Sequence, residues 1–179
     1  MRSVHNLWLL PVAAIVSPVY AADYLTAEQA QKVIFSDAQS FEAKPVNLTS
    51  DQKDKIKSLS GVRQRWDTQK IWRAVKEGKT AGWFVVDEVI GKHEFITYGV
   101  GLTPEGHVVG VEIMSYRESY GGGVREASWR KNFVGKTLVD PFKLDEDVPN
   151  ISGGTLSSRN VLDGVKRVLV IQKVLNLKE

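Results

Sequence analysis

The C-terminal part of the chain has the hydrophobic spacing of an amphipathic helix. Apolar residues recur there at positions i, i+1, i+4, i+7 and i+8, namely Val161, Leu162, Val165, Val168 and Leu169. This spacing places them on a single stripe of a helix. We therefore expect a helix that follows the small-residue loop 152–155 and buries this stripe.

Capping patterns predict two shorter helices near the N-terminus. Thr26 is followed three residues later by Gln29, and Thr49 by Gln52. In such a capping box each side chain bonds to the backbone N–H of the other residue. The first box lies in an amphipathic segment, 23–37, and the second begins a short charged helix that we expect to end at Gly61.

Between these helices the pattern changes to that of β-strands. The four expected strands are residues 71–76, 83–89, 95–102 and 107–114. Short connections join them, including a tight turn with Pro104 at its second position. Consecutive strands with short turns favour an antiparallel sheet. The sequence thus predicts an α+β fold, with a half-barrel-like antiparallel sheet and helices at both ends of the chain.

Residues 1–21 are typical of a cleavable export signal. Arg2 precedes an apolar run over residues 7–16, and small residues, Val19 and Ala21, flank position 20. We expect cleavage near Ala21/Ala22 and a periplasmic or otherwise exported protein without a membrane span after cleavage. An uncleaved N-terminal anchor is the alternative. The mature chain, 22–179, is then one domain, with a helical N-terminal part, 22–62, and a second part, 70–175.

Composition excludes several kinds of site. The chain has no Cys, which excludes disulfides, Cys-ligated iron–sulfur clusters and thioether-linked haem. Loss of residues 1–21 lowers the net charge only from +3 to +2, and the basic residues are scattered, which argues against nucleic-acid binding. The three His residues do not have the spacing of metal ligands, so we predict no metal site.

The segment 150–164 carries the strongest candidate chemistry. Ser152, Gly153, Gly154 and Thr155 form a small-residue loop directly before the C-terminal helix, and Ser157 and Ser158 follow. Glycine allows close approach of a ligand, and the N–H groups at a helix start favour a phosphate. The alternative is an ordinary loop in which a Ser or Thr caps the helix.

A second glycine-rich segment, 116–125, follows the last expected strand. Three consecutive glycines, 121–123, are costly unless a backbone or a ligand approaches closely. Tyr116 and Tyr120 could stack on a planar ring, and Arg117 and Glu118 could contact its polar edge. A flexible surface loop is the alternative.

Both segments resemble the FMN-binding domain family, which includes flavin-carrying subunits of the Rnf complex and of the sodium-pumping NADH:quinone oxidoreductase. The sequence SGGTLSS is similar to the family's Ser/Thr-Gly-Ala-Thr motif, Glu118-Ser119-Tyr120-Gly121 to its Glu-Thr-Pro-Gly-type loop, and 129–136 to its Phe-x-Gly-Lys element. The motif differs at Gly154, where the family has Ala, and at Pro149, where it has Asp.

The resemblance implies FMN as the cofactor, linked through its phosphate to Thr155 by a dedicated flavin transferase. It places twelve residues at the cofactor: Thr155, Ser152, Gly153, Gly154, Leu156, Ser157, Ser158, Tyr116, Glu118, Ser119, Tyr120 and Gly121. The function implied is an exported electron carrier, rather than an enzyme with its own substrate, whose partners are membrane or periplasmic redox proteins. Two alternatives stay open: a non-covalent flavin-binding sensor or reductase module, and a flavin-free adaptor domain.

Overall fold

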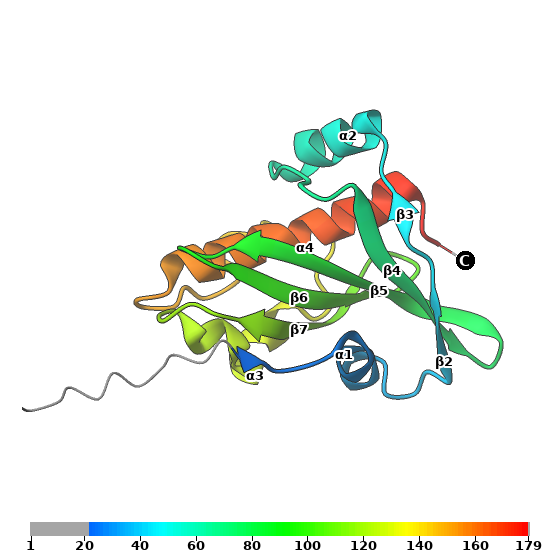
Figure 1. The fold of residues 1–179 in the computed structure, drawn as a ribbon, viewed down its shortest axis with the longest axis horizontal. Coiled ribbons are helices and arrows are strands. Elements are labelled where there is room, and N and C mark those ends of the chain that lie inside the picture. The colour runs from blue at the N-terminus through cyan, green and yellow to red at the C-terminus, as the bar shows by residue number, and fades with distance from the viewer. Residues whose placement is uncertain (1–21, 179) are drawn as a thin grey trace, which may run out of the picture.

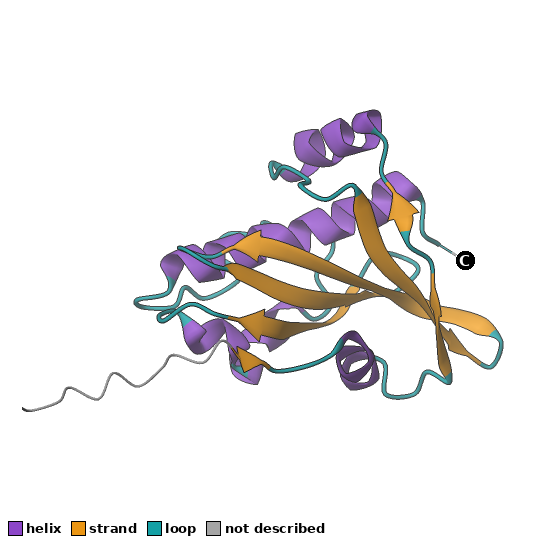
Figure 2. Ribbon diagram, in the orientation of Figure 1, coloured by secondary structure: helices purple, strands orange, loops and turns teal. Residues whose placement is uncertain are grey.

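A computed structural model describes residues 22–178, so the predicted export signal, 1–21, lies outside the described residues. The elements follow one another in the order β1 (Ala22–Asp23), α1 (Ala27–Ile34), β2 (Ser40–Ala43), β3 (Val46–Asn47), α2 (Ser50–Ser60), β4 (Thr68–Lys76), β5 (Lys79–Ile90), β6 (Phe95–Leu102), β7 (Val108–Tyr116), η1 (Gly122–Arg125), α3 (Ala127–Arg130), η2 (Lys131–Phe133) and α4 (Thr155–Leu175). Helices, strands and loops are distinguished in Figure 2.

The strands form one open antiparallel sheet in the order β1-β7-β6-β5-β4-β2, and β3 pairs with β4 beside this path. β4 to β7 form a meander of consecutive neighbours, because short turns join them. The expected α+β fold with an antiparallel sheet is confirmed. The expected strand 95–102 has the same bounds as β6, and the other three expected strands are longer in the structure.

Helices cover the two faces of the sheet (Figure 1). α4 lies along one face, where the predicted stripe is buried: Val161, Leu162, Val165, Val168 and Leu169. α1 lies across the other face and contributes Ala30 to a smaller cluster with Phe84 and Met114. α2 packs against the C-terminal half of α4 through Ile56. The core therefore fixes the middle of α4 against the sheet and its later turns against α2.

Both predicted capping boxes are present. At α1, the hydroxyl of Thr26 accepts from the N–H of Gln29, whose side chain accepts from the N–H of Thr26. Thr49 and Gln52 make the same pair at α2. α2 ends at Gly61, in the left-handed conformation that is typical of a helix stop at glycine.

The sequence led us to expect a helical N-terminal part, 22–62, but this part also contains strands. It contributes three short strands, β1, β2 and β3, to the sheet that the later strands form. β2 pairs with β4 through residues 40–43 and 72–75, and β1 pairs with the end of β7. Strands of two to four residues are too short to show a period of two, so only the pairing partner identifies them.

Candidate functional site

The two segments singled out in the sequence meet at one end of the sheet. The β5–β6 hairpin, the end of β7 and the start of α4 come together there, at the left of Figure 1. A hydrogen bond of 2.6 Å from the side chain of Asn160, on the second turn of α4, to the carbonyl of Ile90 joins the helix to the hairpin. The candidate site is therefore built from three separate parts of the chain.

The start of α4 has an unusual cap. Gly153 is left-handed with φ +73°, and the N–H of Gly154 bonds to the carbonyl of Ile151 at 2.9 Å in a tight turn. Gly154 is then the N-cap, and within the described chain no side chain bonds to the N–H groups at this helix end. The alternative of a Ser or Thr cap is thus not what the structure shows. Uncapped N–H groups at a helix start suit an anion.

The hydroxyls of this segment have different environments. Thr155, the first residue of α4, is exposed, whereas Ser157 and Ser158 are buried. The Ser158 hydroxyl lies 3.1 Å from the carbonyl of Gly154 and 3.2 Å from the side-chain oxygen of Asn150. Ser157 faces the interior of the molecule, and Leu156 faces solvent with 51% of its surface exposed. Within this segment, the exposed hydroxyl residues are therefore Ser152 and Thr155, which another protein can reach from solvent.

The second glycine segment packs directly on the first. Gly121 has φ +81°, and a Cβ at Gly154 would lie 2.6 Å from the Cα of Gly121. The two loops can therefore touch only because both residues are glycine. The Tyr116 hydroxyl donates to the carbonyl of Tyr120 and lies 3.2 Å from the Ser157 hydroxyl, which ties the loop to the first turn of α4. Burial raises the pKa of Tyr116 above its usual value.

Glu118 has a structural partner of its own. Its carboxylate accepts from the N–H groups of His93 and of Glu94, the latter at 3.0 Å, and so caps the β5–β6 turn. Partial burial works to raise the pKa of Glu118, but these backbone hydrogen bonds outweigh it and lower the pKa. Ser119 is exposed, as is Tyr120, with 78% of its surface. The predicted ring contacts of these three residues stay a prediction.

The loop before α4 is held by residues that the sequence analysis did not assign to the site. The carboxylate of Asp147 accepts from Lys136 at 2.8 Å and from the N–H groups of Phe142 and Lys143. Trp129 donates from its indole N–H to the carbonyl of Pro149 at 2.8 Å. The Phe-x-Gly-Lys element at 133–136 thus supports the loop before the helix through Lys136. Its resemblance to the family marked this element in the sequence but did not show which residue it contacts.

One basic side chain follows Thr155 closely along the helix. Arg159 follows it by one helical turn, so both lie on the same side of α4. Together with Lys143 and Asp163, Arg159 lines a cleft of about 330 Å³. Burial raises the pKa of Asp163, and the charges of Arg159 and Lys166 only partly offset this. A free helix start, an exposed hydroxyl and a nearby guanidinium together fit a phosphate ester on Thr155.

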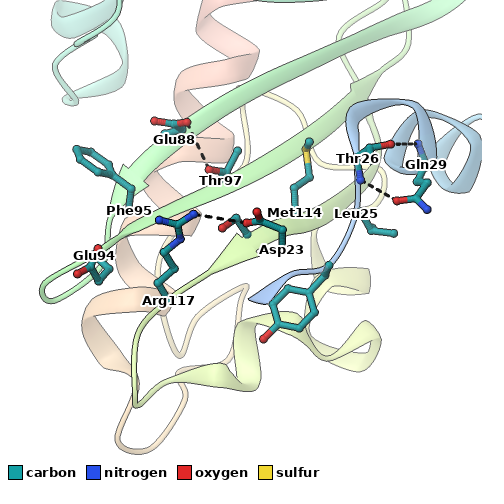
Figure 3. A pocket seen from close by; sticks show the side chains of 12 residues that line it. Asp23, Leu25, Thr26, Gln29, Glu88, Glu94, Phe95, Thr97, Met114 and Arg117 are labelled. Carbon is teal, nitrogen blue, oxygen red and sulfur yellow. Dashed lines mark hydrogen bonds and ion pairs between the residues drawn. The ribbon is translucent and has the colours of Figure 1, made fainter. Parts of the chain in front are cut away.

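A larger cleft, of about 540 Å³, lies on the other face of the sheet (Figure 3). It is lined by Thr97 and Glu88 from the strands and by residues at the start of α1. None of the twelve residues that the resemblance places at the cofactor lines it, although Arg117, considered as a contact for the polar edge of a planar ring, does. Among residues 22–178 there is neither a cluster of side chains suited to a metal ion nor a helix long and apolar enough to span a membrane.

Comparisons with known proteins bear directly on this site. Residues 91–170, which contain both glycine segments, match the model of the FMN-binding domain family. The chain is 27% identical over 163 residues to one component of the proton-translocating ferredoxin:NAD(+) oxidoreductase complex of Clostridium ljungdahlii, covering 87% of this chain and 80% of that component. The fold of this chain is similar to that of Shewanella oneidensis NqrC in its crystal structure, with a TM-score of 0.56 and 15% identity. The match covers 80% of this chain and 87% of the NqrC chain. The resemblance stated from the two segments is confirmed.

Proposed function

Since this chain carries an FMN-binding domain and FMN is its cofactor, we propose that it is an exported electron carrier whose FMN is esterified through its phosphate to Thr155. The observation that supports this most directly is the uncapped start of α4, with the Thr155 hydroxyl exposed on its first turn. A phosphate there would accept from the free backbone N–H groups and would lie at the positive end of the helix dipole.

Attachment requires an activated donor, because direct condensation of FMN with a hydroxyl releases water and is unfavourable in water. We propose that a flavin transferase uses a flavin dinucleotide. The Thr155 oxygen forms a bond to the flavin-side phosphorus, the phosphoanhydride bond breaks, and a nucleoside monophosphate and a proton leave. The exposure of Thr155 supports this step, because the transferase must reach the hydroxyl.

The surrounding residues hold the ester rather than carry out the reaction. Gly153, which is exposed and has no neighbour at the place of a Cβ, keeps the backbone bare at the phosphate, and Arg159 adds a nearby positive charge. The bond network of Asp147 and Lys136 keeps the preceding loop in place. When bound, FMN supplies the electron-accepting and electron-donating ring, and the protein supplies its position and its electrostatic surroundings.

The difference from the family motif at Gly154 has a physical reason. An Ala there would place its Cβ 2.6 Å from Gly121, so the close contact of the two loops requires glycine. The difference therefore follows from loop packing and does not alter the hydroxyl at Thr155. At the other difference, Pro149, the carbonyl accepts the Trp129 indole N–H, so this position also supports the loop.

Export and redox partners complete the proposal. Residues 1–21 have the pattern of an export signal, and tethering is useful outside the cytoplasm because a covalently bound flavin cannot diffuse away. The relatives named above include a component of an oxidoreductase complex, which makes membrane redox proteins reasonable donors and acceptors. The flavin transferase must act before these redox partners, because it attaches the flavin that carries the electrons.

The test is the intact mass and absorbance of the full chain, expressed with a flavin transferase and exported. We expect a yellow protein heavier by FMN less one water. Thr155→Val, which keeps the shape but lacks the hydroxyl, should lose this mass, and Thr155→Ser should retain it at least in part. A yellow protein of unmodified mass that bleaches on denaturation would support the non-covalent alternative, and a colourless protein that added FMN does not restore would overturn the proposal.

A further inference from the structure

The cleft of Figure 3 carries chemistry that the flavin site does not use. It lies on the sheet face that α1 covers, opposite to α4, yet at the same end of the sheet as Thr155, because Arg117 on its rim directly follows Tyr116. Its volume of about 540 Å³ is large enough for one or two long side chains of another molecule.

The cleft carries an excess of negative charge. Three carboxylates line it, those of Asp23, Glu88 and Glu94, against the single guanidinium of Arg117. Arg117 lies 3.8 Å from Asp23, an exposed pair. Within residues 22–178, neither Glu88 nor Glu94 forms an ion pair; Glu88 is half-buried on the strand surface, with the Thr97 hydroxyl at 3.4 Å. Two carboxylates therefore remain without a cation, that of the half-buried Glu88 and that of the exposed Glu94.

An aromatic surface adjoins these carboxylates. Phe95 projects at the edge of the cleft and is 41% exposed, and its ring lies 5.9 Å from that of Trp66, itself 38% exposed. A planar guanidinium stacks on such rings while its N–H groups bond to carboxylates. An ammonium ion could use the carboxylates but gains less from the flat aromatic face.

The surface continues beyond this cleft. A second hollow of about 470 Å³ is lined by Trp66 and Lys70, and Glu88 lines both hollows. The contact between Trp66 and Phe95 bridges them. A single small cation fills only one of these hollows, whereas a stretch of polypeptide can lie across both.

We propose that this cleft receives an arginine side chain from a basic segment of a partner protein, with the guanidinium between Glu88, Glu94 and the ring of Phe95. The segment continues over Trp66 into the second hollow. The partner is held at the flavin end of the molecule, on the sheet face opposite to α4. The interaction needs neither the flavin nor its attachment, so it can be tested independently of the function proposed above.

The experiment is an NMR titration of the full-length ¹⁵N-labelled protein with a capped Gly-Arg-Gly-Arg-Gly peptide. The matched probe replaces each arginine with citrulline, which has nearly the same shape but no charge. We expect the arginine peptide to shift the amide signals of Glu88, Phe95 and Thr97, and the citrulline peptide to bind much more weakly. Binding should also weaken as salt rises from about 0.05 M to about 0.5 M.

Three variants identify the carboxylates responsible. Glu88→Gln and Glu94→Gln should each weaken binding about two- to fivefold, as expected for a partly exposed ion pair. Glu77→Gln, at the exposed turn between β4 and β5, removes the same charge away from the cleft and should leave binding unchanged. The proposal fails if the citrulline peptide binds equally well, if the control variant weakens binding as much, or if free arginine amide binds as tightly as the peptide.

Discussion

Replacing Arg167 tests how firmly α4 is attached to the sheet. Its side chain is 2% exposed and donates to one carboxylate oxygen of Asp87 from two nitrogens, at 2.7 and 2.9 Å. It also donates to the carbonyls of Arg63 and Glu88, at 2.9 and 2.8 Å. The hydroxyl of Tyr98 donates to the same oxygen of Asp87. One buried side chain thus joins α4, β5 and the segment before β4.

Arg167→Met keeps much of the volume of the side chain but leaves the Asp87 carboxylate buried without a cation. Removing one partner of a buried ion pair costs about 3–5 kcal/mol. The two carbonyls that lose a donor add to this cost, although neighbouring effects do not sum. We therefore expect the free energy of unfolding to fall by about 4 kcal/mol, a large share of the roughly 5–15 kcal/mol typical of a domain.

The measurement is urea unfolding followed by tryptophan fluorescence and circular dichroism, with the slope against urea compared between variants. Arg73→Met is the matched control, because its pair with Glu42 is partly exposed and should be worth about 1 kcal/mol or less. The double variant Arg167→Met with Asp87→Asn should recover part of the loss, since it removes both charges. A loss below about 1 kcal/mol in the single variant, or no recovery in the double, would refute this account.

Three further predictions concern single residues. Gly154→Ala should cost about 1–3 kcal/mol in urea unfolding, because its Cβ must displace the backbone of Gly121; a neutral result would contradict the close packing. Burial works to raise the pKa of Asp147, but hydrogen bonds from Lys136 and from the backbone outweigh it and lower the pKa. The ionised Asp147 should therefore stabilise the fold above its unfolded pKa, and this contribution should be lost as the pH falls through the folded pKa. In Asp147→Asn, the free energy of unfolding should fall less steeply with acid. Burial, and after it the charge of Asp87, raises the pKa of Tyr98. The stabilisation of the fold by the neutral Tyr98 is therefore complete below about pH 10, the unfolded pKa, and is lost as the pH rises above it. The stability advantage of the wild type over Tyr98→Phe should shrink by about 1.4 kcal/mol per pH unit above about pH 10, and a constant difference would contradict this.

Local patterns are sufficient for the elements that carry their own signals. Thr26 and Thr49 can be identified as caps because a capping box is complete within four residues. The bounds of β6 can be predicted because an apolar, β-branched run ends at clear turn residues on both sides. The helix after Thr155 follows from its stripe, although its end at Leu175 does not, because the last turns contact α2 as well as the sheet.

The two segments of the candidate site stand out in the sequence, but the contacts between them do not. The exposed hydroxyl of Thr155 and the glycines before it stand out in the sequence, and the family match supports the cofactor. For glycines 121–123 the sequence leaves open the close approach of either a backbone or a ligand, and the structure shows a backbone at Gly121, which lies against Gly154. The sequence did not reveal that the Glu118 carboxylate caps a turn 24 residues away, and its expected contact with the flavin ring stays a prediction.

The acidic run before α4 shows the same limit. Residues 145–147 have the pattern of a solvated loop, but the Asp147 side chain is only 14% exposed and is paired with Lys136. Nothing within the run distinguishes Asp147 from its neighbours Asp145 and Glu146, because the partner comes from a different part of the chain. An ion pair between residues 11 positions apart, with no regular element between them, leaves no periodic trace in the sequence.

The sequence by itself determined the order of the main helices and strands, the α+β class, the capped ends of α1 and α2, and the hydroxyl loop before α4, because each depends on residues within a few positions of one another. Only the tertiary structure decided that β1 to β3 join the sheet, that Gly121 closes on Gly154, and that Arg167 and Asp87 meet beneath α4. Those features depend on contacts between distant segments, such as the pair of Arg167 and Asp87 at a separation of 80 residues, whose free energy is set by burial and shape after the chain has folded.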